Sequence, residues 1–126
     1  MDHVYFLPKD SHWGFVWWEL SSRTMEGISA QVEKMSDARL YLRVHDITNI
    51  IFDGHNSHSQ FDVEVSGASG HWYLRIPESG RVYCVEVGFK AGGLSFIPAA
   101  RSNPLWLPRD GPSGSSEEHW STIKLD

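Results

Sequence analysis

Polar and hydrophobic residues alternate with a period of two along most of the chain, which is the pattern of β-strands that bury one face. Residues 39–45 show it most clearly, because Leu40, Leu42 and Val44 fall on one side of the segment. Residues 81–87 are hydrophobic on both sides, which is typical of a central strand. Strands are predicted at residues 15–20, 39–45, 61–65, 72–76, 81–87, 94–97 and 105–107.

Turn signals separate these segments and favour antiparallel pairing. A tight turn is predicted at residues 77–80, which end on a glycine, and a hairpin turn at residues 91–93. No alternation of strands and helices supports a parallel sheet. The sequence therefore predicts a mainly all-β fold, an antiparallel β-sandwich of about seven strands.

One segment has the spacing of a helix instead. Met25, Ile28, Val32 and Met35 recur at steps of three and four residues, which places them on one helical face. Ser21 or Ser22 is positioned to cap the first turn. We predict one short α-helix near residues 22–35.

The C-terminal residues differ in composition from the rest of the chain. Residues 108–116 are rich in proline, glycine and serine, which is typical of a flexible linker. We predict a single domain over residues 1–108 and a flexible tail over residues 109–126. Trp120 lies in this tail. We hypothesise that the segment around it binds another copy of the chain as an added β-strand.

Composition limits the compartment and the class of partner. The 126 residues are 40% hydrophobic, enough for a core without a metal or a disulfide. The single cysteine, Cys84, allows no internal disulfide, and with a polar start to the chain it indicates a cytoplasmic protein. No hydrophobic run is long enough to cross a membrane. The net charge of −5 argues against a nucleic-acid partner.

Five short motifs resemble the bacterial domain-of-unknown-function 4912 family over about residues 4–108. The resemblance implies an immunoglobulin-like or early-set sandwich and no known reaction. Because some relatives accompany glycan-processing domains, it also implies a possible link with glycans. The motifs lie at residues 17–20, 42–48, 72–74, 83–88 and 100–104.

Several polar residues stand inside or beside the hydrophobic segments. A buried charge must be paired or hydrogen-bonded, so these residues are expected to form a structural polar network, for example Glu86 with Arg43 or Arg101. A small-ligand site between strands is the functional alternative. The predicted network consists of Glu19, Arg43, Asp46, Glu86, Arg101 and Asn103.

Tryptophan is unusually frequent, with six residues in the chain. Adjacent Trp17 and Trp18 must point to opposite faces of their strand, so one belongs to the core and the other to an outer face. An exposed row of aromatic residues on a sandwich is a plausible partner surface, whereas ordinary core packing is the structural alternative. The candidate partner-binding residues are Trp13, Trp17, Trp18, Trp72 and Trp106.

Signals for catalysis or for a cofactor are weak. His55 and His58 lie near Asp53, but two histidines and an acid in a Gly/Ser/Asn loop fall short of a zinc ligand set. Cys84 lies in a hydrophobic strand, where cysteines are usually inert. We expect no catalytic residues, no metal and no cofactor.

These patterns predict a non-catalytic binding module that recognises a protein partner, or a second copy of the chain, through an aromatic-rich face. A carbohydrate-binding module is the alternative, and it requires coplanar exposed rings beside polar groups. A minor enzyme with a charged pocket near Glu19, Asp46 and Glu86 is a third hypothesis.

Overall fold

The structure is a computed structural model that describes residues 2–32, 39–90 and 95–109. In this part of the chain it contains eight strands and one helix. In chain order the elements are β1 (His3–Pro8), β2 (Trp13–Glu19), α1 (Ser22–Val32), β3 (Arg39–Asp46), β4 (Ser59–Val65), β5 (Ser69–Arg75), β6 (Val82–Lys90), β7 (Ile97–Arg101) and β8 (Leu105–Trp106).

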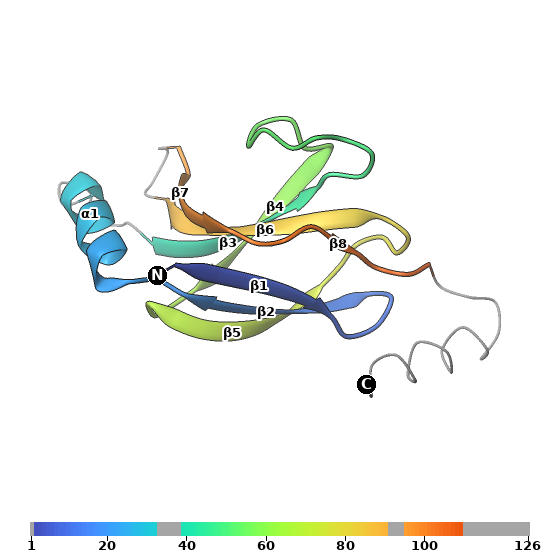
Figure 1. The fold of residues 1–126 in the computed structure, drawn as a ribbon, viewed down its shortest axis with the longest axis horizontal. Helices are drawn as coiled ribbons and strands as arrows, with labels where there is room; N and C mark the ends of the chain where they lie inside the picture. Colours follow the sequence, from blue (N-terminus) through green and yellow to red (C-terminus); the bar gives the residue numbers. More distant parts are fainter. Residues whose placement is uncertain (1, 33–38, 91–94, 110–126) are drawn as a thin grey trace.

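Two antiparallel sheets pack face to face and form a β-sandwich (Figure 1). The smaller sheet has the strand order β1-β2-β5 and the larger one β4-β3-β6-β7, with β8 paired to the start of β6. With the first seven strands lettered A, B, C, C′, E, F and G, the sheets are A-B-E and C′-C-F-G, as in immunoglobulin-like sandwiches. The predicted sandwich is confirmed, and so is the central position of the strand in residues 81–87, here β6.

Alternate residues of the two sheets fill the space between them. The predicted row of Leu40, Leu42 and Val44 is buried, as are Leu74 and Ile76 of the segment that begins at Trp72. Complete burial of a side chain of this size contributes about 1.5–3 kcal/mol to folding. The other large buried side chains of this core include Phe6, Val16, Trp18, Tyr83, Val85, Val87 and Leu107.

Two glycines let the largest core rings lie against the backbone of the smaller sheet. A Cβ atom at Gly14 would collide with the ring of Phe6 on the neighbouring strand, and one at Gly70 would lie 2.8 Å from the ring of Trp18. Neither ring could keep its position beside an alanine. The two glycines therefore set the thickness of the core on this side.

Helix α1 lies at one end of the sandwich, beside the N-terminus (Figure 1). The Oγ atom of Ser21 accepts a hydrogen bond from the backbone N–H of Thr24 at 3.2 Å, so Ser21 is the N-cap. The Asp2 carboxylate accepts hydrogen bonds from the backbone of Ser21 and the hydroxyl of Thr24. Ile28 is buried and Met25 is partly buried against the core, as predicted. The predicted continuation through residue 35 lies outside the described residues.

The structure contains one strand that the sequence pattern did not predict, and another strand begins later than predicted. Strand β1 was not predicted, because Val4 to Leu7 form an unbroken hydrophobic run rather than an alternating one. Strand β7 begins at Ile97 rather than at residue 94, and residue 94 lies outside the described residues, as does the hairpin turn predicted at residues 91–93. Residues 110–126, including Trp120, also lie outside them.

A tyrosine ties the link between the sheets to the start of β6. The hydroxyl of Tyr83 donates to the carbonyl oxygen of Glu78 at 3.0 Å. A tyrosine near the start of the sixth strand of an immunoglobulin-like sandwich, bonded a few residues back, is a tyrosine corner. The tight turn predicted at residues 77–80 falls in the same link, which the structure shows as a series of bends, and Gly80 has a positive φ of 74° that glycine adopts without strain.

No helix in the described part of the chain is long and hydrophobic enough to cross a lipid bilayer.

Candidate functional site

The outer face of the smaller sheet carries a cluster of large hydrophobic side chains. The strand register places Tyr5 opposite Trp17, and Phe15 between Leu7 and Tyr73. Residues opposite one another project to the same side of a sheet, and this side faces away from the core. The exposed fractions are 41% for Tyr5, 53% for Leu7, 45% for Trp17 and 51% for Tyr73. We define the aromatic face as Tyr5, Leu7, Trp13, Phe15, Trp17 and Tyr73.

The rings of the aromatic face contact one another. The ring centres of Tyr5 and Trp17 lie 5.2 Å apart with an interplanar angle of 17°, and His3 stacks on Tyr5 at 5.5 Å. The rings of Phe15 and Tyr73 lie 5.1 Å apart at a tilt of 55°. These contacts join the three strands into a continuous surface whose rings support each other.

Positive side chains border one end of the aromatic face. The Lys9 ammonium lies 5.4 Å from the centre of the Tyr73 ring, and the Arg75 guanidinium lies 5.8 Å from the centre of the Trp13 ring. Glu19 lies at the other end of β2, where it is exposed and opposite His3 in register. The face thus has a basic end on a chain whose net charge is −5.

The structure separates the five tryptophans predicted to bind a partner. Trp17 and Trp18 point to opposite faces, as predicted, but Trp18 is only 1% exposed and its Nε1 donates to the carbonyl of Gly67. Trp72 is on the core side of β5 at the open edge of the sheet, and Trp106 is exposed on the other sheet. Because Trp18 is a core residue, it cannot contact a partner. Of the five, the aromatic face contains Trp13 and Trp17.

The predicted polar network proves to be several separate clusters, and the first joins β3, β4 and β6. Arg43 donates two hydrogen bonds to the Asp62 carboxylate, at 2.8 and 3.0 Å, and Lys90 donates a third at 2.6 Å. Burial acts to raise the pKa of Asp62, but the hydrogen bonds from both cations outweigh it and hold the pKa below its usual range. Arg43 therefore pairs with Asp62 and not with Glu86, which it faces in register.

The second cluster surrounds Glu86 on the outer side of the larger sheet. Nε2 of the buried His45 donates to Glu86 Oε1 at 2.8 Å, and Arg101 donates to Oε2 at 3.2 and 3.3 Å. Burial acts to raise the pKa of Glu86, but the hydrogen bond from His45 and the nearby positive charge outweigh it and lower the pKa. The ring of Phe52 contacts both His45 and the Arg101 guanidinium. The predicted pairing of Glu86 with Arg101 is thus present in the structure.

The remaining predicted polar residues lie apart from these two clusters. Asp46 accepts hydrogen bonds from Arg81 at 2.6 Å and from the Thr48 hydroxyl at 2.7 Å. The amide of Asn103 accepts from the backbone N–H of Phe6 and donates to its carbonyl, so it pairs with the edge of β1 as a neighbouring strand would. Glu19 is exposed and belongs to neither cluster, which contradicts its assignment to a buried network.

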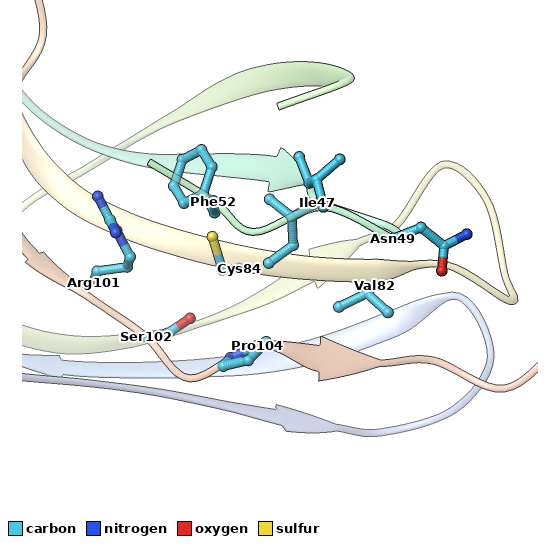
Figure 2. Close-up of a pocket in the computed structure, with 9 residues that line it drawn as sticks. Ile47, Asn49, Phe52, Val82, Cys84, Arg101, Ser102 and Pro104 are labelled. Atoms are coloured by element: carbon cyan, nitrogen blue, oxygen red, sulfur yellow. The ribbon is translucent and has the colours of Figure 1, made fainter. Parts of the chain in front are cut away.

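A pocket of about 350 Å³ lies beside the second cluster, between the loop after β3 and the segment that joins β7 to β8 (Figure 2). Cys84 of β6 lies in the middle of the pocket, with Arg101 beside Phe52 at one end and Asn49 at the other. The rest of the lining is mostly hydrophobic and consists of Ile47, Ile50, Val82, Ser102 and Pro104.

Cys84 lines this pocket, and His58 lies in the loop just before β4. Burial, followed by the nearby Glu86 charge, raises the pKa of the Cys84 thiol to about 11, so the thiol stays protonated and is a poor nucleophile. Nε2 of His58 donates to the carbonyl of Thr48 at 2.7 Å. Within residues 2–32, 39–90 and 95–109, no three His, Cys, Asp or Glu side chains are grouped to hold a metal ion.

In a comparison with protein families, residues 1–118 match the family described as Domain of unknown function (DUF4912). The chain belongs to the DUF4912 family. No match was found among curated proteins. Because the family match covers both sheets, it includes the aromatic face and the pocket, and its description assigns no function to either.

Several residues of the aromatic face and of the polar clusters in this DUF4912 chain were not predicted from the sequence. Tyr5 and Leu7 were missed together with β1, and Asp62 was not included in the predicted polar network. Tyr73 alternates with Leu74, so its outward position was available from the pattern. Phe52 lies in an irregular loop, where no periodicity marks a ring that covers two charged side chains.

Proposed function

We propose that this domain is a non-catalytic binding module that recognises a protein partner through the aromatic face. The observation that carries the proposal is that Tyr5, Leu7, Trp17 and Tyr73 adjoin on one sheet surface and are each 41–53% exposed. Isolated exposed hydrophobic residues are ordinary, whereas a contiguous patch of them marks an interaction site. Tyrosine and tryptophan are also the residues that dominate binding energy at protein interfaces.

The charges around the aromatic face favour an acidic partner. Lys9 and Arg75 lie over its rings at the end near the β1–β2 turn, whereas the chain as a whole is acidic. An acidic segment with hydrophobic side chains would contact the rings and complement these cations. Opposite charges at the rim of an interface raise the association rate and select the partner.

Ring geometry favours a protein over a glycan. Sugar rings stack on aromatic faces that lie open to solvent, but the rings of Tyr5 and Trp17 are nearly parallel and 5.2 Å apart. His3 lies nearly parallel to Tyr5 as well, so much of the Tyr5 ring contacts other side chains of the domain. Such a cluster offers hydrophobic edges and grooves, which suit the side chains of a peptide.

The test is a parallel screen of the full chain against a random phage-displayed peptide library and a panel of polysaccharides. We expect enrichment of acidic peptides with hydrophobic residues, and binding that shifts tryptophan emission. Trp17→Ala should weaken a selected peptide by about thirtyfold or more, the effect of losing a hot-spot side chain worth about 2 kcal/mol.

Trp106→Ala is the matched control, because it removes an exposed tryptophan from the other sheet and should leave affinity unchanged. Selected peptides that bind the Trp17→Ala chain as tightly as the original would contradict the proposal. Binding to a polysaccharide that is lost in Trp17→Ala would instead establish the carbohydrate-binding alternative.

A further inference from the structure

The pocket beside Glu86 lies on the opposite side of the molecule from the aromatic face. The aromatic face covers the outer side of the smaller sheet, whereas the pocket is on the outer side of the larger one, over Val82 and Cys84 of β6. A partner on the aromatic face would leave the pocket accessible. Its volume of about 350 Å³ is at the small end of the range for ligand sites, roughly 300–1,000 Å³.

One end of the pocket offers hydrogen-bond donors that carry a positive charge. The Arg101 side chain is 43% exposed, and its hydrogen bonds within the described residues go to one oxygen of Glu86, at 3.2 and 3.3 Å. A guanidinium has five N–H donors, so others remain available to a ligand. The Phe52 ring lies 4.6 Å from the guanidinium carbon and holds this group at the pocket wall.

The Glu86 carboxylate beneath Arg101 is shared between Arg101 and His45. Its side chain is only 5% exposed, and its Oε1 is occupied by the hydrogen bond from His45. Glu86 therefore positions Arg101 from below and leaves the outer side of the guanidinium toward solvent and the pocket. An arginine fixed by packing and by a carboxylate binds a ligand carboxylate with little loss of side-chain freedom.

The opposite end of the pocket carries a polar side chain on an unusual backbone. Asn49 has a φ of 60°, in the left-handed region that asparagine tolerates better than most residues. Its side chain is exposed and makes no hydrogen bond to any residue that the structure describes. Figure 2 shows it at the far end of the pocket from Arg101. Its amide is available to a hydroxyl or carbonyl of a ligand.

Between the two ends the pocket is hydrophobic and chemically inert. Ile47, Val82 and Pro104 line it, and the protonated Cys84 thiol behaves as a small hydrophobic group. The Ser102 hydroxyl is already used, because it accepts from the backbone of Val85 and donates to the next carbonyl along the chain. The middle of the pocket therefore suits the hydrophobic body of a ligand.

We propose that this pocket binds a small hydrophobic carboxylate, with the carboxylate on Arg101, the hydrophobic body over Cys84 and a second polar group at Asn49. Along the pocket, the Arg101 cation, the hydrophobic wall around Cys84 and the Asn49 amide follow in the same order as the matching groups of such a ligand. The inference does not depend on the proposed protein partner, since the two surfaces share no residue.

The test is an NMR titration of the full, isotope-labelled chain with 4-hydroxyphenylacetate and with its neutral analogue tyrosol, which has an alcohol in place of the carboxylate. We expect the carboxylate to shift the amides of Cys84 and Ser102 and to bind about tenfold or more tightly than tyrosol, the effect of a charge-assisted hydrogen bond. This comparison uses the unaltered chain and so does not depend on the folding of any variant.

Variants then assign the groups. Arg101→Gln should lower affinity for the carboxylate about tenfold and leave tyrosol unchanged, whereas Cys84→Leu should fill the pocket and weaken both. Arg75→Gln is the matched control, because it removes an arginine that also lies over an aromatic ring but on the other side of the molecule. Absence of shifts at the pocket amides, equal binding of both compounds, or unchanged carboxylate binding by a folded Arg101→Gln chain would each overturn the proposal.

Discussion

Asp62 accepts hydrogen bonds from two cations and is the residue on which the charged surface of the larger sheet depends most. Its side chain is 18% exposed, as is that of Arg43, and Lys90 bonds to the same carboxylate. The Phe96 ring lies 4.3 Å from the Arg43 guanidinium carbon and screens the pair from water. Partly buried, bidentate pairs of this kind contribute more than exposed pairs, because solvent and salt screen them less.

We predict that Asp62→Asn lowers the free energy of unfolding by about 1–3 kcal/mol, because it leaves two partly buried cations without their shared carboxylate. Urea denaturation measures the change. Glu64→Gln on the same strand is the control, since Glu64 lies 4.0 Å from Arg39 with both side chains about 60% exposed, and it should change stability by less than about 0.5 kcal/mol. Equal effects of the two substitutions would contradict this account.

The sequence indicated which polar residues need partners but not every partner. The pairing of Glu86 with Arg101 was among the alternatives weighed, and it is present. The partner of Arg43 was missed because Asp62 alternates with Phe61 and Val63 and so resembles any solvated strand residue. Cross-strand neighbours depend on register, and register depends on pairing over long stretches of chain, which a local pattern does not contain.

Strands were predictable where their two faces differ and unpredictable where they do not. Strand β3 was predicted from its alternating pattern, and strand β6 from a run that is hydrophobic on both faces. Strand β1 was missed because Tyr5 and Leu7, which alternate with the buried Val4 and Phe6, are themselves large hydrophobic residues. The feature that concealed this strand, a hydrophobic outer face, is the same feature that supports the proposed binding role.

Strands β1 and β2 pack closely where Gly14 lies against the ring of Phe6. Gly14→Ala should destabilise the domain by about 1–3 kcal/mol, because the new methyl group would collide with the buried ring of Phe6. Thermal and urea unfolding measure the loss.

Gly27→Ala is the matched control, since Gly27 is in the exposed part of α1 with nothing within 4 Å of a new Cβ. Alanine has the higher helix propensity, so this substitution should stabilise the domain by up to about 1 kcal/mol. A Gly14→Ala chain as stable as the original would show that the Phe6 ring can move without cost.

At the scale of the whole molecule, the two outer faces of the sandwich differ in chemistry. The smaller sheet presents rings and a few cations, whereas the larger one presents carboxylates paired with cations and the pocket. Both arise from one sandwich because the inner sides of the sheets supply the core and leave the outer sides free to diverge. The sequence predicted the sandwich well, but it could not assign residues to outer faces before the strands were paired.

Because of the paired carboxylates, the stability of the folded domain depends on pH. Asp46, Asp62 and Glu86 have folded-state pKa values below their usual ranges, because hydrogen bonds from neighbouring groups outweigh the opposing effect of burial. Their contribution to stability is therefore complete above the ordinary carboxyl pKa values of about 4, and it is lost as the pH falls through the lower folded-state pKa values.

We predict a melting temperature that falls steeply as the pH drops below about 4, the ordinary pKa of these carboxyls, measured by circular dichroism. The Asp62→Asn chain should show a smaller fall, since one of the linked carboxyls is absent. A melting temperature that stays constant down to pH 3 would contradict the assigned ion pairs.

The amide of Asn103 has a consequence for the symmetry of any assembly through the smaller sheet. The Asn103 amide uses the backbone N–H and C=O of Phe6, and β7 and β8 run beside β1 (Figure 1). This edge of the sheet is therefore closed to another strand. Among the residues that the structure describes, no strand lies beyond β5 in this sheet. A second copy that paired with this edge would join β5 to β5 about a two-fold axis, which would close the assembly at a dimer. Head-to-tail growth into a filament would need the edge that Asn103 blocks.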